Sequence, residues 1–329
     1  MHAFSTPAPE GPGSEGTGPQ GTGPEGTVGA GPGSDAIGLD IGGTKTHGIR
    51  LRNGAVIAEA VAGSANVQNV SVEAARASLA DVFTRLGTRG VTRVIAGSGG
   101  VDTEQDAAAL RALISTHVPD AAVDVVHDTR LILAAGSASE GIAVIAGTGS
   151  VAWGTNAAGR QARSGGWGYL LGDEGSGYWI GREAVRHSLR LNNLGREPDA
   201  LSTALLQAVD LSNPTELIGL FHGGTDRRYW AGKAGLVFEA ARAGSPAATD
   251  IVHTAAEHLA GLTTDVARLL KISGPVVVGG GLGMHQPLFQ DLLRTRLNAA
   301  GLADVRYLNQ DPVLGTAYLL GTERAGHGS

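Results

Sequence analysis

Two short glycine-threonine stretches carry the residue types that bind phosphate. DIGGTKT spans residues 40–46 and AGTGS spans residues 146–150. Glycine lets the backbone approach a ligand and turn its N–H groups toward an anion, and the threonine hydroxyl adds a donor. Either stretch alone is compatible with an ordinary hairpin turn. Because both follow a short apolar run, we predict that they bind the two ends of one triphosphate. The predicted phosphate ligands are Gly42, Gly43, Thr44, Lys45, Thr148 and Gly149.

Strand geometry bears on the role of Lys45, and metal chemistry suggests a role for Asp40. Lys45 is an attractive phosphate ligand, but side-chain alternation along a strand favours an outward direction for it. Asp40 ends the preceding apolar run and is placed to hold a magnesium ion through its bound waters. We therefore predict Mg²⁺ at Asp40.

A third glycine cluster, VGGGLG at residues 278–283, follows a buried-type strand and precedes a helix. Glycines at such a place admit a flat ring close to the backbone, as an adenosine requires. Neither the GxxxxGK[ST] loop nor a GxGxxG fingerprint between a predicted strand and a predicted helix occurs in the chain. The three clusters together predict ATP binding, with Gly280 and Gly281 beside the nucleoside.

The elements that position these residues form a repeated pattern. Three short apolar runs from Ala36, separated by turn-like GT and NG signals, predict a strand meander, and helix, strand, helix and strand follow up to Asp128. A second meander begins at GIAVIAGTGS, and helices, further short strands and a terminal helix complete it. The pattern predicts an α/β fold of duplicated domains with a ligand crevice between them. One doubly wound sheet is the alternative. We place the domains at residues 35–128 and 129–311, with helix 312–325 completing the first.

Composition excludes several classes of function. The net charge of −6 and the lack of basic clusters argue against nucleic acid or an anionic membrane as a partner. No apolar run is long enough to span a membrane, so a cytoplasmic location is expected. The chain has no cysteine, which excludes disulfides, thiolate zinc sites and cysteine-held iron–sulfur clusters.

The first 34 residues have a different composition from the rest of the chain. They consist largely of Gly, Pro, Ser, Thr and Glu, without lysine or arginine. A segment of this kind buries too little apolar surface to offset its chain entropy. It also lacks the basic and apolar regions of a secretory signal. We predict that residues 1–34 form a disordered, passive tail.

Three further motifs, GTGS (147–150), GGWG (165–168) and LGDEGSGYWIG (171–181), carry a family resemblance. With them the chain resembles the BadF/BadG/BcrA/BcrD-type group of the sugar kinase, actin and Hsp70 ATPase superfamily, which contains N-acetylglucosamine kinase. The resemblance implies duplicated ribonuclease H-like (actin-like ATPase) domains and a homodimer. Dehydratase activators of the superfamily need cysteine. ROK sugar kinases share DIGGTK but typically add a cysteine-rich zinc site and an ExGH motif, both absent here.

The resemblance also implies roles for individual residues. Asp128 is the expected general base, although an aspartate here would also suit a helix cap. Strand alternation predicts that His127 points away from it. Glu174 is either a second acceptor for a sugar hydroxyl or, as we expect, a cap for the helix that follows, and Trp167 is expected to pack against the sheet. Asn66 is a sugar contact or a plain turn asparagine. The implied substrate-binding residues are Asn66, Asp128, Gly165, Gly166, Gly172 and Asp173.

The expected function is therefore an ATP-dependent kinase of an amino sugar, with N-acetylglucosamine and its 6-hydroxyl as the first choice. Kinases of glucosamine or N-acetylmuramic acid are alternatives within the same class. A non-catalytic sugar sensor and an ATPase that energises a partner protein are alternatives from other classes. Retention of Asp40, Asp128 and both glycine turns argues against the sensor, and the absence of cysteine argues against the activator-like ATPase.

Overall fold

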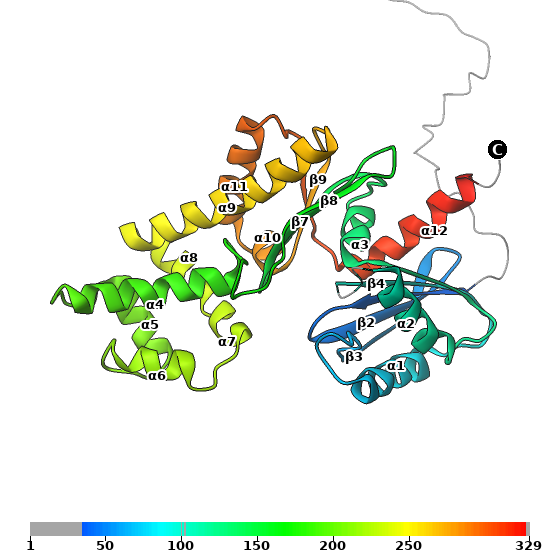
Figure 1. Cartoon of the computed structure of the whole chain (residues 1–329), viewed down its shortest axis with the longest axis horizontal. Coiled ribbons are helices and arrows are strands. Elements are labelled where there is room, and N and C mark those ends of the chain that lie inside the picture. Colours follow the sequence, from blue (N-terminus) through cyan, green and yellow to red (C-terminus); the bar gives the residue numbers. More distant parts are fainter. Residues whose placement is uncertain (1–34, 100, 102, 327–329) are drawn as a thin grey trace, which may run out of the picture.

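Two five-stranded mixed sheets, with helices packed on them, form the framework of the protein in this computed structural model (Figure 1). The structure describes residues 35–99, 101 and 103–326. The predicted tail, residues 1–34, lies outside the described residues. The two sheets lie next to each other, and a group of helices extends from the second sheet away from the first.

The N-terminal sheet has the strand order β3-β2-β1-β4-β5. β1, β2 and β3 are antiparallel neighbours, and β4 and β5 continue the sheet in parallel with β1. β1 is buried along nearly its whole length, as expected for a central strand with helices on both faces. The strands are β1 (Asp35–Ile41), β2 (Lys45–Arg52), β3 (Ala55–Gly63), β4 (Val91–Ser98) and β5 (Ala122–His127).

The C-terminal sheet repeats this arrangement. Its order is β8-β7-β6-β9-β10, so that β6 takes the place of β1, with the same antiparallel and parallel pairings. The predicted duplicated α/β architecture is confirmed, and the alternative of one doubly wound sheet is wrong. The strands are β6 (Gly141–Ala146), β7 (Ser150–Thr155), β8 (Gln161–Gly165), β9 (Val276–Gly279) and β10 (Val305–Tyr307).

The two halves differ in the helices between their third and fourth strands. One helix, α1, occupies this position in the N-terminal half, whereas α4 to α9 occupy it in the C-terminal half. These helices bury the largest hydrophobic cluster of the described residues against β6, β7 and β9. The helices up to this point are α1 (Val72–Leu86), α2 (Glu104–Ser115), α3 (Asp128–Ala135), α4 (Gly177–Asn193), α5 (Ala200–Ala208), α6 (Glu216–His222), α7 (Arg227–Ala231), α8 (Ala234–Arg242) and α9 (Pro246–Leu270).

The chain crosses between the two sheets twice. It passes from β5 through α3 to β6, and it returns from β10 through a short 3-10 turn, η1 (Pro312–Leu314), to α12 (Gly315–Gly326). α12 packs on α3 and on β1, where a side chain at Gly38 would overlap Thr316. The C-terminal helix thus lies against the N-terminal sheet. The remaining helices are α10 (Gly281–His285) and α11 (Pro287–Ala299).

Candidate active site

The two glycine-threonine turns occupy equivalent positions in the two sheets. The first joins β1 to β2 and the second joins β6 to β7. The Gly42 N–H donates to the Lys45 carbonyl at 3.0 Å, and the Gly147 N–H donates to the Gly149 carbonyl at 3.1 Å. The turns are therefore at the places that the phosphate prediction requires. Which of their atoms contact a nucleotide stays a prediction.

The third glycine cluster packs against the second turn. Gly280 has φ +85°, and a Cβ there would lie 2.6 Å from the Ala146 carbonyl oxygen, so only glycine fits. A Cβ at Gly281 would meet no heavy atom within 4 Å. Open space therefore remains beside the cluster, where the adenosine was predicted.

Asp40 lies at the end of β1, close to two other carboxylates. Loss of surrounding water, and then the negative charges of Asp128 and Asp311, raise the pKa of Asp40 to about 7. Asp311 itself contacts two basic side chains: the Lys45 ammonium at 3.6 Å and the His47 ring at 3.1 Å. The Lys45 side chain is half-exposed and directed to Asp311, so its phosphate contact stays a prediction.

Asp128 is the first residue of α3, directly after β5. The structure gives the helix-cap role to His127, whose ring accepts the Thr129 N–H, so capping does not occupy Asp128. His127 does not point away. Its Nδ1 lies 3.0 Å from an Asp128 oxygen, because the strand ends at His127 and the backbone turns into the helix. That oxygen is buried without an aligned hydrogen bond.

Asp173 sits against the second turn rather than in an open pocket. It is buried, and it adopts φ +63°, which is uncommon for a non-glycine residue. One carboxylate oxygen accepts the Ser150 N–H at 3.1 Å, and the other is buried without a partner. Burial raises the pKa of Asp173, opposed by the Ser150 hydrogen bond and by the charge of Arg227. The free oxygen is available to a ligand hydroxyl.

The glycines predicted to hold a sugar are already bonded within their own loop. The Arg163 guanidinium donates to the carbonyls of Gly165 and Gly166 at 3.1 Å each. The Gly172 N–H donates to the Gly168 carbonyl at 2.8 Å. Direct sugar contacts of these backbone groups stay a prediction.

Two expectations about the same loop are wrong. Trp167 does not pack against the sheet: it is 63% exposed, with the Arg163 guanidinium 4.6 Å from its ring centroid. Glu174 does not cap the next helix, because Ser176 accepts the Trp179 N–H there at 3.1 Å. Serine is a strong N-cap residue, and it lies nearer to the first helical turn.

Asn66 belongs to a loop that supports the first phosphate turn. Its side-chain oxygen accepts the Gln68 N–H at 3.0 Å, which is the turn role. Its own N–H donates to the Ser64 hydroxyl, which in turn donates to the Gly42 carbonyl at 2.7 Å. Two hydrogen bonds, through Ser64, thus connect Asn66 to the turn, and its sugar contact stays a prediction.

Sequence reasoning missed two arginines on α7. The Arg228 guanidinium donates to the Gly43 carbonyl at 2.8 Å, across 185 residues of sequence. Arg227 lies close by, with its Nη2 4.0 Å from the position that a Cβ on Gly43 would take. The only available signal was the adjacent arginine pair in DRRYW (226–230), after an aspartate suited to an N-cap.

The acidic side chains at this site fit a hydrated magnesium ion. In the described part of the chain, no group of three or more His, Cys, Asp or Glu residues is arranged to hold a metal ion. Mg²⁺ needs few protein ligands, since it keeps several waters and binds phosphate oxygens. Asp40, with its raised pKa beside Asp128, is where a cation would relieve the repulsion.

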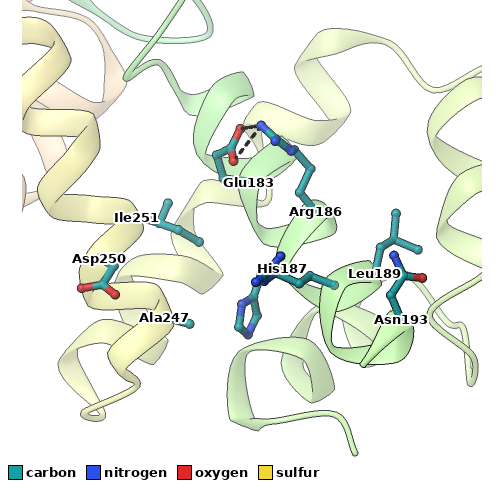
Figure 2. Close-up of a pocket in the computed structure, with 9 residues that line it drawn as sticks. Glu183, Arg186, His187, Leu189, Asn193, Ala247, Asp250 and Ile251 are labelled. Atoms are coloured by element: carbon teal, nitrogen blue, oxygen red, sulfur yellow. Dashed lines mark hydrogen bonds and ion pairs between the residues drawn. The ribbon is translucent and has the colours of Figure 1, made fainter. Parts of the chain in front are cut away.

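A separate surface groove of about 650 Å³ lies between α4 and α9 (Figure 2). Charges of both signs line it, including a pair between Glu183 and Arg186 at 3.1 Å. None of the predicted site residues is among its lining residues. The groove is not part of the candidate active site.

None of the described helices is long and apolar enough to cross a membrane.

Known proteins resemble this chain over most of its length. An N-acetylmuramic acid/N-acetylglucosamine kinase of Clostridium acetobutylicum is 31% identical over 274 residues, 80% of this chain and 90% of that protein. An N-acetyl-D-glucosamine kinase of Dictyostelium discoideum is 28% identical, over 86% of this chain and 96% of that protein. A ROK-family glucokinase from Streptomyces griseus, solved with glucose and AMPPNP, shares the fold with a TM-score of 0.57, at 17% identity over 87% and 99% of the chains.

A match to a protein family also covers most of the chain. The BadF/BadG/BcrA/BcrD ATPase family matches residues 37–319, which include both sheets, all three glycine clusters and the GGWG and GDEGS motifs. The resemblance inferred from those motifs is thereby confirmed. The chain belongs to the BadF/BadG/BcrA/BcrD ATPase family.

Proposed function

We propose that the protein is an ATP-dependent kinase that phosphorylates an amino sugar, with N-acetylglucosamine as the first candidate. The observation that carries the proposal is Asp128, a carboxylate with one unsatisfied buried oxygen, free of any cap role and beside Asp40. The sugar-kinase relatives support the choice of acceptor.

The proposed reaction is an in-line phosphoryl transfer. The oxygen of a sugar hydroxyl forms a bond to the γ-phosphorus of ATP, while the bond from that phosphorus to the β–γ bridging oxygen breaks. The electron pair of the broken bond stays on ADP, and the hydroxyl proton goes to the Asp128 carboxylate. Help from a general base of this kind accelerates a reaction by about 10²–10⁴-fold.

The other residues position the sugar and the phosphates and neutralise the phosphate charge. Asp173 offers its unpartnered oxygen to a sugar hydroxyl, and the glycine turns present N–H groups to the phosphates. Asp40 would hold Mg²⁺, which when bound neutralises charge on the phosphate oxygens. The division into domains at residues 128 and 129, with helix 312–325 completing the first domain, is part of this proposal. It is supported by the packing of α12 on β1.

A coupled assay of ADP release tests the proposal. Release that depends on N-acetylglucosamine, and is weaker with glucosamine, N-acetylmuramic acid and glucose, is expected. Release without any sugar would favour the partner-energising ATPase, and no release with any of these sugars would favour the sensor. Phosphate on a hydroxyl other than the 6-hydroxyl, read by NMR of the product, would correct the regiochemistry.

N-acetylmuramic acid is a second acceptor candidate, because one relative acts on both sugars by its name. The two sugars differ by a lactyl ether on the 3-hydroxyl, so the ratio of their kcat/KM values separates the two candidates.

We also infer that the protein is a homodimer and that it is cytoplasmic. Light scattering in line with gel filtration checks the dimer, and a mass of one chain would reject it.

A further inference from the structure

We propose that Arg227 of α7 is a catalytic residue that binds the phosphates of ATP during transfer. The inference rests on the proposed kinase function. Arg227 would supply the site with a positive charge near the phosphates. Lys45, the cation that the sequence suggests for this role, is directed to Asp311 instead.

One side of α7 packs on the start of α4, next to the second phosphate turn. The backbone of α7 lies so close to α4 that a side chain at Gly181 would overlap the Trp230 carbonyl. At the start of α4, the Gly177 N–H donates to the Gly147 carbonyl at 2.8 Å, and a Cβ at Gly177 would lie 3.4 Å from Ala231. α7 and the second turn therefore pack on the same end of α4.

The other side of α7 meets the first phosphate turn. Arg228 donates to the Gly43 carbonyl at 2.8 Å, which ties α7 to the opposite half of the molecule. The Asp226 carboxylate accepts the N–H groups of Arg228 and Tyr229, which fixes the start of the helix. A five-residue helix thus contacts the first glycine turn directly and shares its packing site on α4 with the second turn, with its two arginines on the side of the first turn.

Arg227 has a charge that is not otherwise used. Among the residues that the structure describes, none forms a hydrogen bond or an ion pair with the Arg227 guanidinium. It is half-buried, within 4.0 Å of the Cβ position of Gly43 and near enough to Asp173 to act on its pKa. A half-buried guanidinium between two anion-binding turns has the chemistry of a phosphate ligand.

Arg227 forms and breaks no covalent bond in the proposed phosphoryl transfer. As the bond to the bridging oxygen breaks, negative charge grows on the leaving ADP oxygen and stays spread over the oxygens of the transferred group. The Arg227 N–H groups would donate to these oxygens, and arginine keeps its proton throughout. Its contribution is electrostatic, and it is largest where charge develops.

The test compares Arg227→Gln and Arg227→Lys with a matched control, Arg242→Gln, which removes an exposed arginine of α8 in the same half. We expect Arg227→Gln to lower kcat by about 10²-fold or more, and to weaken ATP binding by about tenfold while leaving adenosine binding unchanged. Arg227→Lys should recover part of the loss, and Arg242→Gln should match the parent. Calorimetry gives the two affinities, and circular dichroism checks folding.

Three results would overturn the inference. One is a kcat of Arg227→Gln close to that of the parent. Another is a rise confined to the sugar KM, which would mean that Arg227 acts through Asp173. The third is an equal loss of ATP and adenosine affinity. If the parent phosphorylates none of the sugars, the kinase proposal fails by itself, and the ATP-to-adenosine comparison still decides whether Arg227 binds phosphate.

Discussion

Asp128 and Asp173 share a feature that is rare in folded proteins: each has one buried carboxylate oxygen without a hydrogen-bond partner. Such an atom costs free energy, which a ligand can recover by supplying the missing partner. The remaining oxygen of Asp173 is held by the Ser150 N–H, whereas Asp128 lies against the His127 ring. At the residue scale, the two carboxylates are prepared for a ligand in different ways.

Asp128→Asn removes the base but keeps the size of the side chain. We expect kcat to fall by about 10²–10⁴-fold, because the amide cannot accept the hydroxyl proton. Sugar affinity should change little, since the amide oxygen still accepts hydrogen bonds. Steady-state kinetics with a calorimetric sugar titration measures both, and near-parent turnover would reject Asp128 as the base.

Gly99→Ala tests the same carboxylate without touching it. A Cβ at Gly99 would lie 2.7 Å from Asp128 Oδ2, so the carboxylate must shift. We expect a fall in kcat with little loss of thermal stability. Gly235→Ala is the matched control, because a Cβ there meets no heavy atom within 4 Å. Equal kinetics of the two variants would show that the carboxylate position is not critical.

At the element scale, the contact between α4 and α7 sets where the α7 arginines lie. Gly181→Ala forces a methyl group into the Trp230 carbonyl, so the helices must separate. Overpacking of this kind costs about 1–3 kcal/mol of unfolding free energy. We expect that loss together with a lower kcat, measured by chemical denaturation and by the ADP assay.

The control for this prediction is Gly261→Ala in α9, where the new Cβ meets no heavy atom within 4 Å. Replacing a helical glycine in open space stabilises a protein by about 0.5–1 kcal/mol. A stable Gly181→Ala variant with parent-like kcat would show that α7 tolerates displacement.

At the scale of the whole molecule, a charge cluster at the start of β1 links two neighbouring strands of the N-terminal sheet to α1. Asp35, at the start of β1, accepts hydrogen bonds from Arg50 and Arg52, and Arg50 also donates to the Leu86 and Gly87 carbonyls after α1. The Arg52 hydrogen bond, with help from Arg50, lowers the pKa of Asp35 to about 2. Strand, neighbouring strand and helix are thus held by one carboxylate.

This cluster predicts a specific acid sensitivity. A lowered pKa means that the stabilisation is complete above the unfolded value, about 3.9, and is lost as the pH falls toward 2. Asp35→Asn should lower the unfolding free energy by about 2 kcal/mol at pH 7. Between pH 4 and pH 2 its stability should fall less steeply than that of the parent.

Denaturant titrations at several pH values measure this difference. Asp120→Asn, at an exposed aspartate, is the control and should follow the parent curve. Parallel curves for Asp35→Asn and the parent would show that the charge of Asp35 does not stabilise the fold.

Much of the fold could be predicted from the sequence, because strand runs and glycine turns are local signals. The repeated meander placed two glycine clusters at strand ends and a separate apolar run placed the third, and the structure agrees. The short helices α6 and α7 could not be delimited, since no strong periodicity marks five to seven residues. The α7 arginines were missed for a related reason: their partner, Gly43, is far away in sequence.

The directions of individual side chains also could not be predicted reliably from local sequence patterns. Strand alternation failed for His127, because a strand end that turns into a helix breaks the two-residue period. Trp167 was expected to pack against the sheet, but the glycine-rich loop carries it outward. The catalytic and sugar-binding assignments of the remaining residues stay predictions.

The two crossings of the chain between the sheets have a practical consequence. A pair of bodies joined by two adjacent covalent connections moves mainly by rotation about one axis, so a single distance describes its opening. Because the chain has no cysteine, two introduced cysteines would be the only thiols available for dyes. One fluorescence distance, between a residue of α1 and a residue of α5, would then show whether the two halves move relative to each other when sugar and nucleotide are added.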